Sequence, residues 1–427
     1  MDHFTYKNNQ LYCEDLPVAD IAAAVGTPAY IYSKATLLHH YHQIANAFAP
    51  LNATICYSIK SCGNLHILKL LASQGSGFDV TSGGELCRAL AAGGDPRKII
   101  YAGVGKTDAE IADAINAGIA AFNIESEAEI ENIDRIAASL GKTAIGAIRI
   151  NPDVDAKTHR YTNTGKKETK FGVDIERAER VFEQSRSLKN LRLAGVHIHL
   201  GSPVFGVEPY VQAVQKVTAL IDRLTQRGHR IEWFDLGGGF AANYEEPHQA
   251  VPIIEHANAL IPLLENKPYK IALEPGRYIS ANAAILLTRV LYRKTGGSKR
   301  FVIIDAAMND LIRPMLYGSF HFIWPTNPDP ANVPLRRDKS LTPANGEVVD
   351  VVGPICESGD FLARNRLLPT TQRNDLLAVF SAGAYCFAMS SNYNNRPRVP
   401  EVLVDGNQYR IIRRRETYED LLTHERI

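Results

Sequence analysis

The chain has 427 residues, of which 45% are hydrophobic and 22% charged; this is the composition of an ordinary globular protein, and the length favours two domains. A net charge of +1 argues against a nucleic-acid or anionic-membrane partner, and no apolar run is long enough to cross a bilayer. Six cysteines without CxxC spacing and a polar N-terminus indicate no zinc site, disulfide framework or secretory signal, so we expect a cytoplasmic protein.

The first expected element is a small hairpin over residues 4–15, which turns at Asn8-Asn9. We expect the N-terminal segment 1–28 to pack with the C-terminal domain described below.

Eight short apolar runs then alternate with amphipathic helical patterns, several of which end in the glycine expected just past a helix. Eight strands alternating with helices predict an α/β fold, a (β/α)8 TIM-type barrel, over residues 29–276. An open doubly wound sheet is the alternative. The eight runs are 53–60, 77–80, 98–103, 120–125, 144–150, 193–201, 231–240 and 270–276.

The pattern changes after residue 276, where strand-like runs follow one another with few helical stretches between them. We therefore predict a mostly β C-terminal domain over residues 277–427. Within it, residues 324–346 are rich in proline and polar residues and are expected to form a loop.

Unusual polar residues fall at the C-terminal ends of the predicted strands, where a barrel of this type carries its active site. They are Lys60, Asp79, Arg149, His197, His199, Ser202, Glu274 and Arg277. The seventh run also continues into three glycines, Gly237 to Gly239. Each feature has an ordinary structural explanation when taken alone, but together they predict a single site.

These residues match the needs of pyridoxal phosphate. Lys60 either reaches solvent or reacts with an aldehyde, and Glu274 either pairs with Arg277 or protonates a pyridine nitrogen. The glycines either make a tight turn or bind a phosphate, and His199 lies near enough to the mouth to pack on a flat ring. A metal-dependent barrel hydrolase is the alternative, but the last two strands lack the further ligands that it would need.

The segments YSIKSC, GFDVTSGGEL, HIHLGS, DLGGGF, EPGR and CESGD together resemble the fold-type III pyridoxal-phosphate-dependent decarboxylases over nearly the whole chain. Residues 158–173, 305–318 and 382–404 are most similar to the diaminopimelate decarboxylase family within that group. The lysine motif reads YSIKSC where YAxKAN is usual, which leaves room for a relative with a different substrate.

The resemblance implies pyridoxal 5'-phosphate as cofactor and decarboxylation of meso-2,6-diaminopimelate to L-lysine, the last step of lysine biosynthesis. The implied cofactor-binding residues are Lys60, Asp79, His199, Ser202, Gly238, Gly239, Glu274 and Tyr385. The implied substrate-binding residues are Arg277, Arg313, Tyr317, Glu357 and Tyr385. Lys60, His199 and Cys356 are the implied catalytic residues, with Cys356 either a proton donor or a buried apolar cysteine.

The resemblance also implies a homodimer whose CESGD segment completes the active site of the partner subunit. Two arginines and a glutamate suit a substrate whose distal end carries both a carboxylate and an ammonium, because arginine binds carboxylates bidentately. The alternatives are a decarboxylase of the same fold for ornithine, arginine, carboxynorspermidine or a carrier-bound amino acid, a racemase of similar architecture, and a non-catalytic relative.

Overall fold

The computed structural model describes residues 2–156, 170–247 and 250–426. The chain divides into two compact units. One comprises Tyr41–Ala241 and Ala250–Tyr278, and is called the barrel unit below. The other comprises Met1–His40, Ala242–Gln249 and Ile279–Ile427, and is called the β unit.

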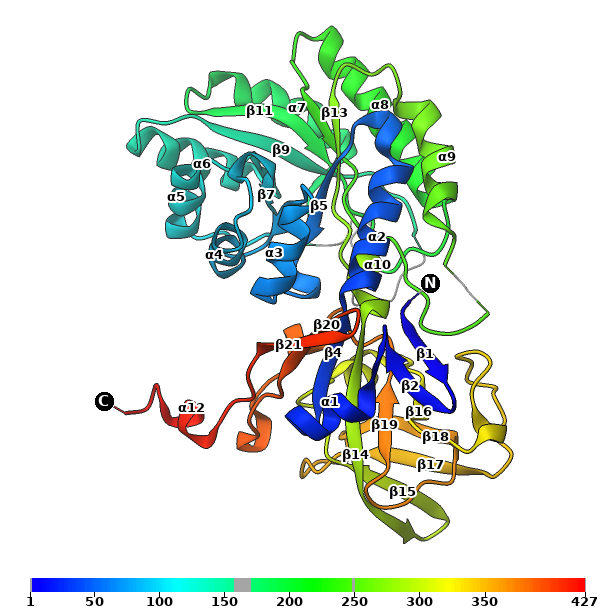
Figure 1. The fold of residues 1–427 in the computed structure, drawn as a ribbon. Coiled ribbons are helices and arrows are strands. Elements are labelled where there is room, and N and C mark those ends of the chain that lie inside the picture. The colour runs from blue at the N-terminus through cyan, green and yellow to red at the C-terminus, as the bar shows by residue number, and fades with distance from the viewer. Residues whose placement is uncertain (1, 157–169, 248–249, 427) are drawn as a thin grey trace. The chain divides into compact units, whose positions relative to one another are not determined.

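Eight parallel strands of the barrel unit form a closed sheet in the order β9-β11-β12-β13-β5-β6-β7-β8, and the pairing of β8 with β9 closes it (Figure 1). Six of the eight strands lie within their predicted runs, whereas β9 extends one residue past its run and β11 begins two residues before its run. The strands are largely buried, as in a parallel sheet covered on its outer face. The predicted (β/α)8 barrel is therefore confirmed. The strands are β5 Thr54–Ser58, β6 Gly77–Val80, β7 Ile99–Tyr101, β8 Ala121–Ile124, β9 Ala144–Asn151, β11 Leu191–His197, β12 Trp233–Asp235 and β13 Lys270–Leu273, with β10 Val173–Asp174 added beside β9.

Helices follow the strands on the outside of the sheet (Figure 1). Their ends obey the local rules expected from the sequence. Thr107 and Glu110 form a reciprocal capping box at the start of α5, and Gly118 ends the same helix with φ 71°. The helices are α2 Lys34–Ala47, α3 Leu65–Ser73, α4 Gly83–Ala91, α5 Asp108–Ala117, α6 Glu127–Ser139, α7 Ile175–Gln184, α8 Glu208–Gln226 and α9 Ile253–Leu264.

The β unit is built on a mostly antiparallel sheet in the order β18-β17-β15-β14-β4-β20-β21, with β19 also paired to β14 and β16 paired to β19. The prediction of a second, mostly β domain is confirmed. Its strands are β4 Ala29–Ser33, β14 Ala284–Gly296, β15 Lys299–Ile304, β16 Ile323–Pro325, β17 Gly346–Val352, β18 Phe361–Pro369, β19 Leu376–Val379, β20 Glu401–Asp405 and β21 Gln408–Arg413. The short helices are α1 Val18–Val25, α11 Arg313–Tyr317 and α12 Tyr418–Leu422, and α10 Arg277–Ser280 follows β13.

The predicted N-terminal hairpin is present. Strands β1 Phe4–Lys7 and β2 Gln10–Cys13 pair antiparallel around Asn8 and Asn9, both with positive φ, and β3 Leu16–Pro17 extends this small sheet. Strand β4 pairs with β14 and β20, so residues 29–40 lie in the β unit, whereas we expected the barrel to begin at residue 29. The apolar run AYIYS carries no signal that tells which sheet it joins.

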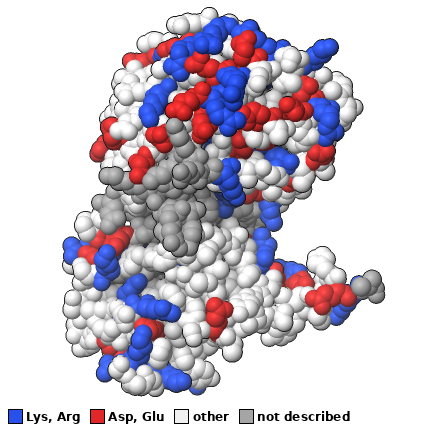
Figure 2. All heavy atoms as spheres, turned by 180° about the vertical axis from the view of Figure 1, so that it is seen from behind, with Lys and Arg blue, Asp and Glu red and all other residues white. Residues whose placement is uncertain are grey.

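Lysine and arginine side chains are interspersed with aspartate and glutamate on the face seen in Figure 2. Among the described helices, none is both long and apolar enough to span a membrane.

Candidate active site

Lys60 lies just beyond the C-terminal end of β5. The strand stops at Ser58 and Lys60 sits in the turn Ile59–Ser61, so the expectation that Lys60 ends the strand itself is wrong by two residues. Its Nζ forms an ion pair with Asp79 at the end of β6, a fully buried carboxylate, while 33% of the Lys60 side chain remains exposed. Ser58 Oγ donates to the same Asp79 oxygen at 2.6 Å. The Lys60 amine is thus held in one place and stays accessible at the barrel mouth.

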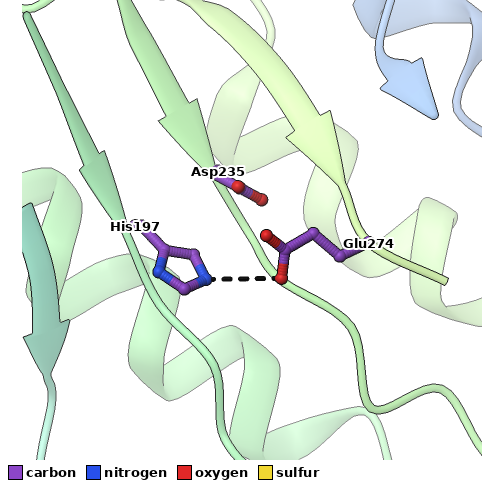
Figure 3. A group of neighbouring side chains, drawn as sticks. All are labelled: His197, Asp235 and Glu274. Carbon is purple, nitrogen blue, oxygen red and sulfur yellow. Dashed lines mark ion pairs between the residues drawn. The ribbon is translucent and has the colours of Figure 1, made fainter. Parts of the chain in front are cut away.

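Figure 3 shows His197, Asp235 and Glu274, which come from the ends of three successive strands and point toward one another. His197 Nε2 lies 3.4 Å from Glu274 Oε2. Asn123 of β8 donates from Nδ2 to both carboxyls, at 3.0 Å to Asp235 Oδ2 and 3.0 Å to Glu274 Oε1. All four side chains are buried, so they form one polar cluster inside the barrel, which we call the carboxyl cluster.

The carboxyl cluster retains a proton near neutral pH. Burial raises the pKa of Asp235, and the neighbouring Glu274 raises it further. Burial also raises the pKa of Glu274, and Asp79 adds to the effect. Burial lowers the pKa of His197 to about 4, so its imidazole is neutral and offers no balancing charge. Two carboxyls this close do not both ionise readily in the interior, because each disfavours the charge of the other.

His199 lies two residues beyond His197 and nearer to solvent, since its ring is half-buried where His197 is buried. Its Nδ1 accepts a hydrogen bond from the Gly201 amide at 3.1 Å, which leaves the ring proton on Nε2. Burial, Arg149 and Lys60 all lower the pKa of His199. The side chain is therefore a neutral, flat ring at the mouth of the barrel.

The glycine turn after β12 can hold only glycine. A Cβ on Gly238 would lie 2.2 Å from the Glu274 carbonyl oxygen, and one on Gly239 would lie 2.4 Å from the Gly201 carbonyl oxygen. The turn thus packs its bare backbone against the loops that carry Glu274 and His199. Beside it, Arg277 Nε donates to Ser202 Oγ at 3.1 Å.

These groups fit pyridoxal phosphate. The close-packed glycine backbone and Ser202 supply hydrogen-bond donors for a phosphate. The carboxyl cluster supplies a proton for a pyridine nitrogen, and His199 supplies a flat surface for a ring. Lys60 supplies the amine, and Asp79 keeps an oxygen, Oδ1, that has no hydrogen-bond partner among the described residues.

Arg313 lies in the β unit at the start of α11 and is 5% exposed. Its Nη1 lies 3.0 Å from His321 Nε2, and its guanidinium carbon lies 4.8 Å from the centroid of the Tyr244 ring. Among the described residues, no carboxylate lies within 4.0 Å of its nitrogens. A buried cation without a counter-ion is costly, and this marks a place where an anionic ligand is expected.

The other predicted residues of the β unit occupy two places. Tyr317 ends the helix that Arg313 begins, and the half-buried Tyr385 packs with Tyr244 against a small alanine cluster. Cys356 and Glu357 lie on an exposed turn, where Glu357 Oε2 accepts from the Tyr393 hydroxyl at 3.0 Å. The alternative of a buried apolar Cys356 is therefore wrong, because its thiol stands on the surface of this unit.

Residues 158–173, which carry part of the family resemblance, lie mostly outside the described residues, which resume at Lys170. The end of the segment is held at the barrel: the Gly172 amide donates to Glu125 Oε2 at 2.8 Å, and the Phe171 ring lies 4.6 Å from the Arg149 guanidinium carbon. Arg149 Nη1 and Glu125 Oε1 form a buried ion pair at 2.9 Å.

Four residues with a place in these groups were not predicted: Asn123, Asp235, Tyr244 and His321. A signal existed for the first two, since an asparagine and an aspartate stand at the C-terminal ends of otherwise apolar barrel runs. Nothing local marks Tyr244 or His321, because their role depends on contacts with a residue far away in the sequence.

Comparison with known proteins defines the class. The family model described as "Pyridoxal-dependent decarboxylase, pyridoxal binding domain" matches residues 34–281. Together with the barrel fold, the match makes the chain an amino-acid decarboxylase that uses pyridoxal phosphate, and it confirms the predicted enzyme class and cofactor.

Relatives narrow this class. Diaminopimelate decarboxylase of Aquifex aeolicus is 45% identical over 417 residues, which cover 98% of this chain and 96% of the relative. The enzyme of that name from Neisseria meningitidis serogroup A is 46% identical over 416 residues, covering 97% and 98%. The crystal structure of diaminopimelate decarboxylase from Helicobacter pylori complexed with L-lysine has a TM-score of 0.88 at 38% identity and covers 96% of this chain and 99% of that one. The chain belongs to the diaminopimelate decarboxylase family, as the motifs predicted.

Proposed function

We propose that the protein removes carbon dioxide from meso-2,6-diaminopimelate and releases L-lysine, with pyridoxal 5'-phosphate as cofactor. The relatives of that name, matched over almost their full length, support the reaction. The observation that carries the choice of substrate is Arg313, a buried cation with no carboxylate partner among the described residues. A diamine-forming decarboxylase has no second carboxylate with which to neutralise such a cation, whereas diaminopimelate keeps one at its distal end.

The cofactor, when bound, supplies the ring that accepts the electrons left behind by carbon dioxide. Lys60 holds it through the side-chain amine, and Asp79 fixes that amine in position. Gly238, Gly239 and Ser202 bind the phosphate, with the Tyr385 hydroxyl as a further donor. His199 packs on one face of the ring, which orients the ring and excludes water from that face.

Glu274 holds a proton at its carboxyl oxygen for the ring nitrogen. Its raised pKa supports this role, because burial makes the carboxyl reluctant to ionise without a cation beside it. Asn123 orients the carboxyl through the hydrogen bond to Oε1, and the neutral His197 lies against the other oxygen.

The residues that determine substrate specificity bind the distal end of the substrate, which does not react. Arg277, Arg313 and Tyr317 bind the distal carboxylate, and Glu357 binds the distal ammonium. Cys356 delivers a proton to the carbon that loses carbon dioxide, a role that its surface-exposed thiol supports.

The functional form proposed is a homodimer in which Cys356 and Glu357 of each copy act in the active site of the other. This rests on the family resemblance, and an exposed turn that carries both residues supports it. The compartment proposed is the cytoplasm, and the lack of a disulfide among the cysteines of the described residues supports it.

The proposed reaction is tested by measuring carbon dioxide release from four substrates: meso-diaminopimelate, L-ornithine, L-arginine and carboxynorspermidine. The purified protein, supplied with pyridoxal phosphate, is expected to act on the first alone. An Arg313→Lys variant is expected to raise KM for meso-diaminopimelate, because lysine cannot bind a carboxylate in bidentate fashion. Faster release from any of the other three substrates would overturn the proposal.

A further inference from the structure

One partner of the buried Arg313 is a histidine, and the side chains of Tyr244 and Cys386 also interact with Arg313. The histidine has a chemical consequence. A guanidinium has only donors, so His321 Nε2, 3.0 Å from Arg313 Nη1, must be the acceptor. The other ring nitrogen, Nδ1, then carries the proton and donates to the Phe380 carbonyl oxygen at 2.9 Å. His321 is fully buried and makes both contacts in one tautomer, the neutral one.

A second contact fixes the plane of the guanidinium. The Tyr244 ring lies against Arg313, and it stands at 90° to the His321 ring with 5.6 Å between centroids. His321 therefore restrains Arg313 from the edge while Tyr244 restrains it from the face. Phe380 in turn extends β19, so the arrangement is tied to the sheet of the β unit.

Neutrality distinguishes this arrangement from a structural ion pair. Three other buried or nearly buried cations have carboxylate partners: Arg149 pairs with Glu125, Lys106 with Glu129 and Arg337 with Asp2. Each of those pairs cancels its charge, but an imidazole acceptor holds a guanidinium in place and leaves its full positive charge. Among the described residues, the contacts of Arg313 with His321 and Tyr244 thus orient its guanidinium and leave its positive charge available for an anionic ligand.

We propose that His321 is a positioning residue for substrate specificity: it orients Arg313 and preserves its charge for the distal carboxylate of the substrate. The proposal rests on the proposed function, which gives Arg313 that carboxylate. Substrate contact belongs to Arg313, and His321 acts through it.

The test uses two inhibitors that differ by this carboxylate. L-Lysine keeps the distal carboxylate and ammonium of diaminopimelate, and 1,5-diaminopentane lacks the carboxylate. The ratio of their inhibition constants therefore measures the carboxylate contact apart from catalysis. It is to be determined for the holoenzyme and for the variants His321→Leu, His321→Gln, His321→Glu and Arg313→Lys, with the absorbance of the bound cofactor as a check on the site.

We expect His321→Leu to weaken the binding of L-lysine about tenfold, which is the scale of one charge-assisted hydrogen bond. The binding of 1,5-diaminopentane should weaken by less than about twofold. Glutamine keeps an acceptor without charge and should recover most of the L-lysine affinity. Glutamate keeps an acceptor but cancels the charge of Arg313. The His321→Glu variant should therefore bind L-lysine at least as weakly as the His321→Leu variant does. If the leucine variant does not fold, the glutamine and glutamate variants decide the question alone.

The outcomes separate the two proposals. If Arg313→Lys leaves the ratio unchanged, Arg313 does not bind the distal carboxylate, and both proposals about this subsite fail. If Arg313→Lys changes the ratio but the His321 variants do not, the substrate assignment stands and the positioning role is overturned. Equal weakening of both inhibitors by His321→Leu, or equal L-lysine affinity in the glutamine and glutamate variants, would also overturn it.

Discussion

Replacing Gly238 with alanine is predicted to disable cofactor binding while leaving the barrel folded. The added Cβ would lie 2.2 Å from the Glu274 carbonyl oxygen, where ordinary contact begins near 3.4 Å, so the turn or the strand end must shift by roughly 1 Å. The turn and the strand end both belong to the proposed site. The turn binds the phosphate, and the strand end carries Glu274, which faces the ring nitrogen. A misplacement of about 1 Å costs roughly a hundredfold, and we expect a loss of that size in the affinity for pyridoxal phosphate.

The assay is an absorbance titration of the apoprotein with pyridoxal phosphate, together with its thermal unfolding. Gly206→Ala is the matched control, because its Cβ would meet nothing within 4 Å and its φ is not in the left-handed region. The control is expected to bind cofactor as the parent does. Affinity within about threefold of the parent for Gly238→Ala would refute the reasoning, since the glycine backbone would then not be the phosphate site.

Three further predictions concern stability and turnover. The pKa of Asp235 is raised to about 8 in the fold, so its contribution to the free energy of unfolding is present at acid pH and is lost as pH rises through about 8. The free energy of unfolding of the apoprotein in urea should therefore fall between about pH 5.5 and about pH 8, and Asp235→Asn should make that fall less steep. An unchanged slope in the variant would contradict this. Arg149→Leu should lower the free energy of unfolding, measured in urea, by about 3–5 kcal/mol, because it leaves the buried Glu125 without its partner cation. Arg192→Leu, which removes an exposed ion pair with Glu232, should lower it by at most about 1 kcal/mol. Cys356→Ser should lower kcat at least about a hundredfold with little change in KM, and an unchanged kcat would exclude the thiol as the proton donor.

Much of the barrel was predictable because its signals are local. The run from Ala53 to Ile59 is apolar and β-prone, a helical pattern separates it from the next run, and the same alternation recurs along the barrel. In a barrel, strand polarity alone brings the C-terminal ends together, so Lys60, Asp79 and Glu274 were expected at one mouth before any distance was known. The end of β5 was misplaced because a helical turn of three residues leaves no trace in the apolar pattern.

What could not be predicted depends on partners that are distant in the sequence. AYIYS reads as a buried strand in any sheet, and only its pairing with β14 and β20 places it in the β unit. Asn123 looks like one polar residue in an apolar strand until its amide is seen between two carboxyls. The proposed role of His321 likewise depends on its contact with a buried arginine, and no local sequence pattern predicts that contact.

The most direct test of the whole account is carbon dioxide release from meso-diaminopimelate by the holoenzyme, by Lys60→Ala and by Lys69→Ala. Lys69 is exposed on α3 and serves as the control for removing a lysine from this unit. The account predicts release by the parent and by Lys69→Ala, with L-lysine as product, and none above background from Lys60→Ala. Undiminished release from Lys60→Ala would contradict it, because the amine at the barrel mouth would then not be the one that holds the cofactor.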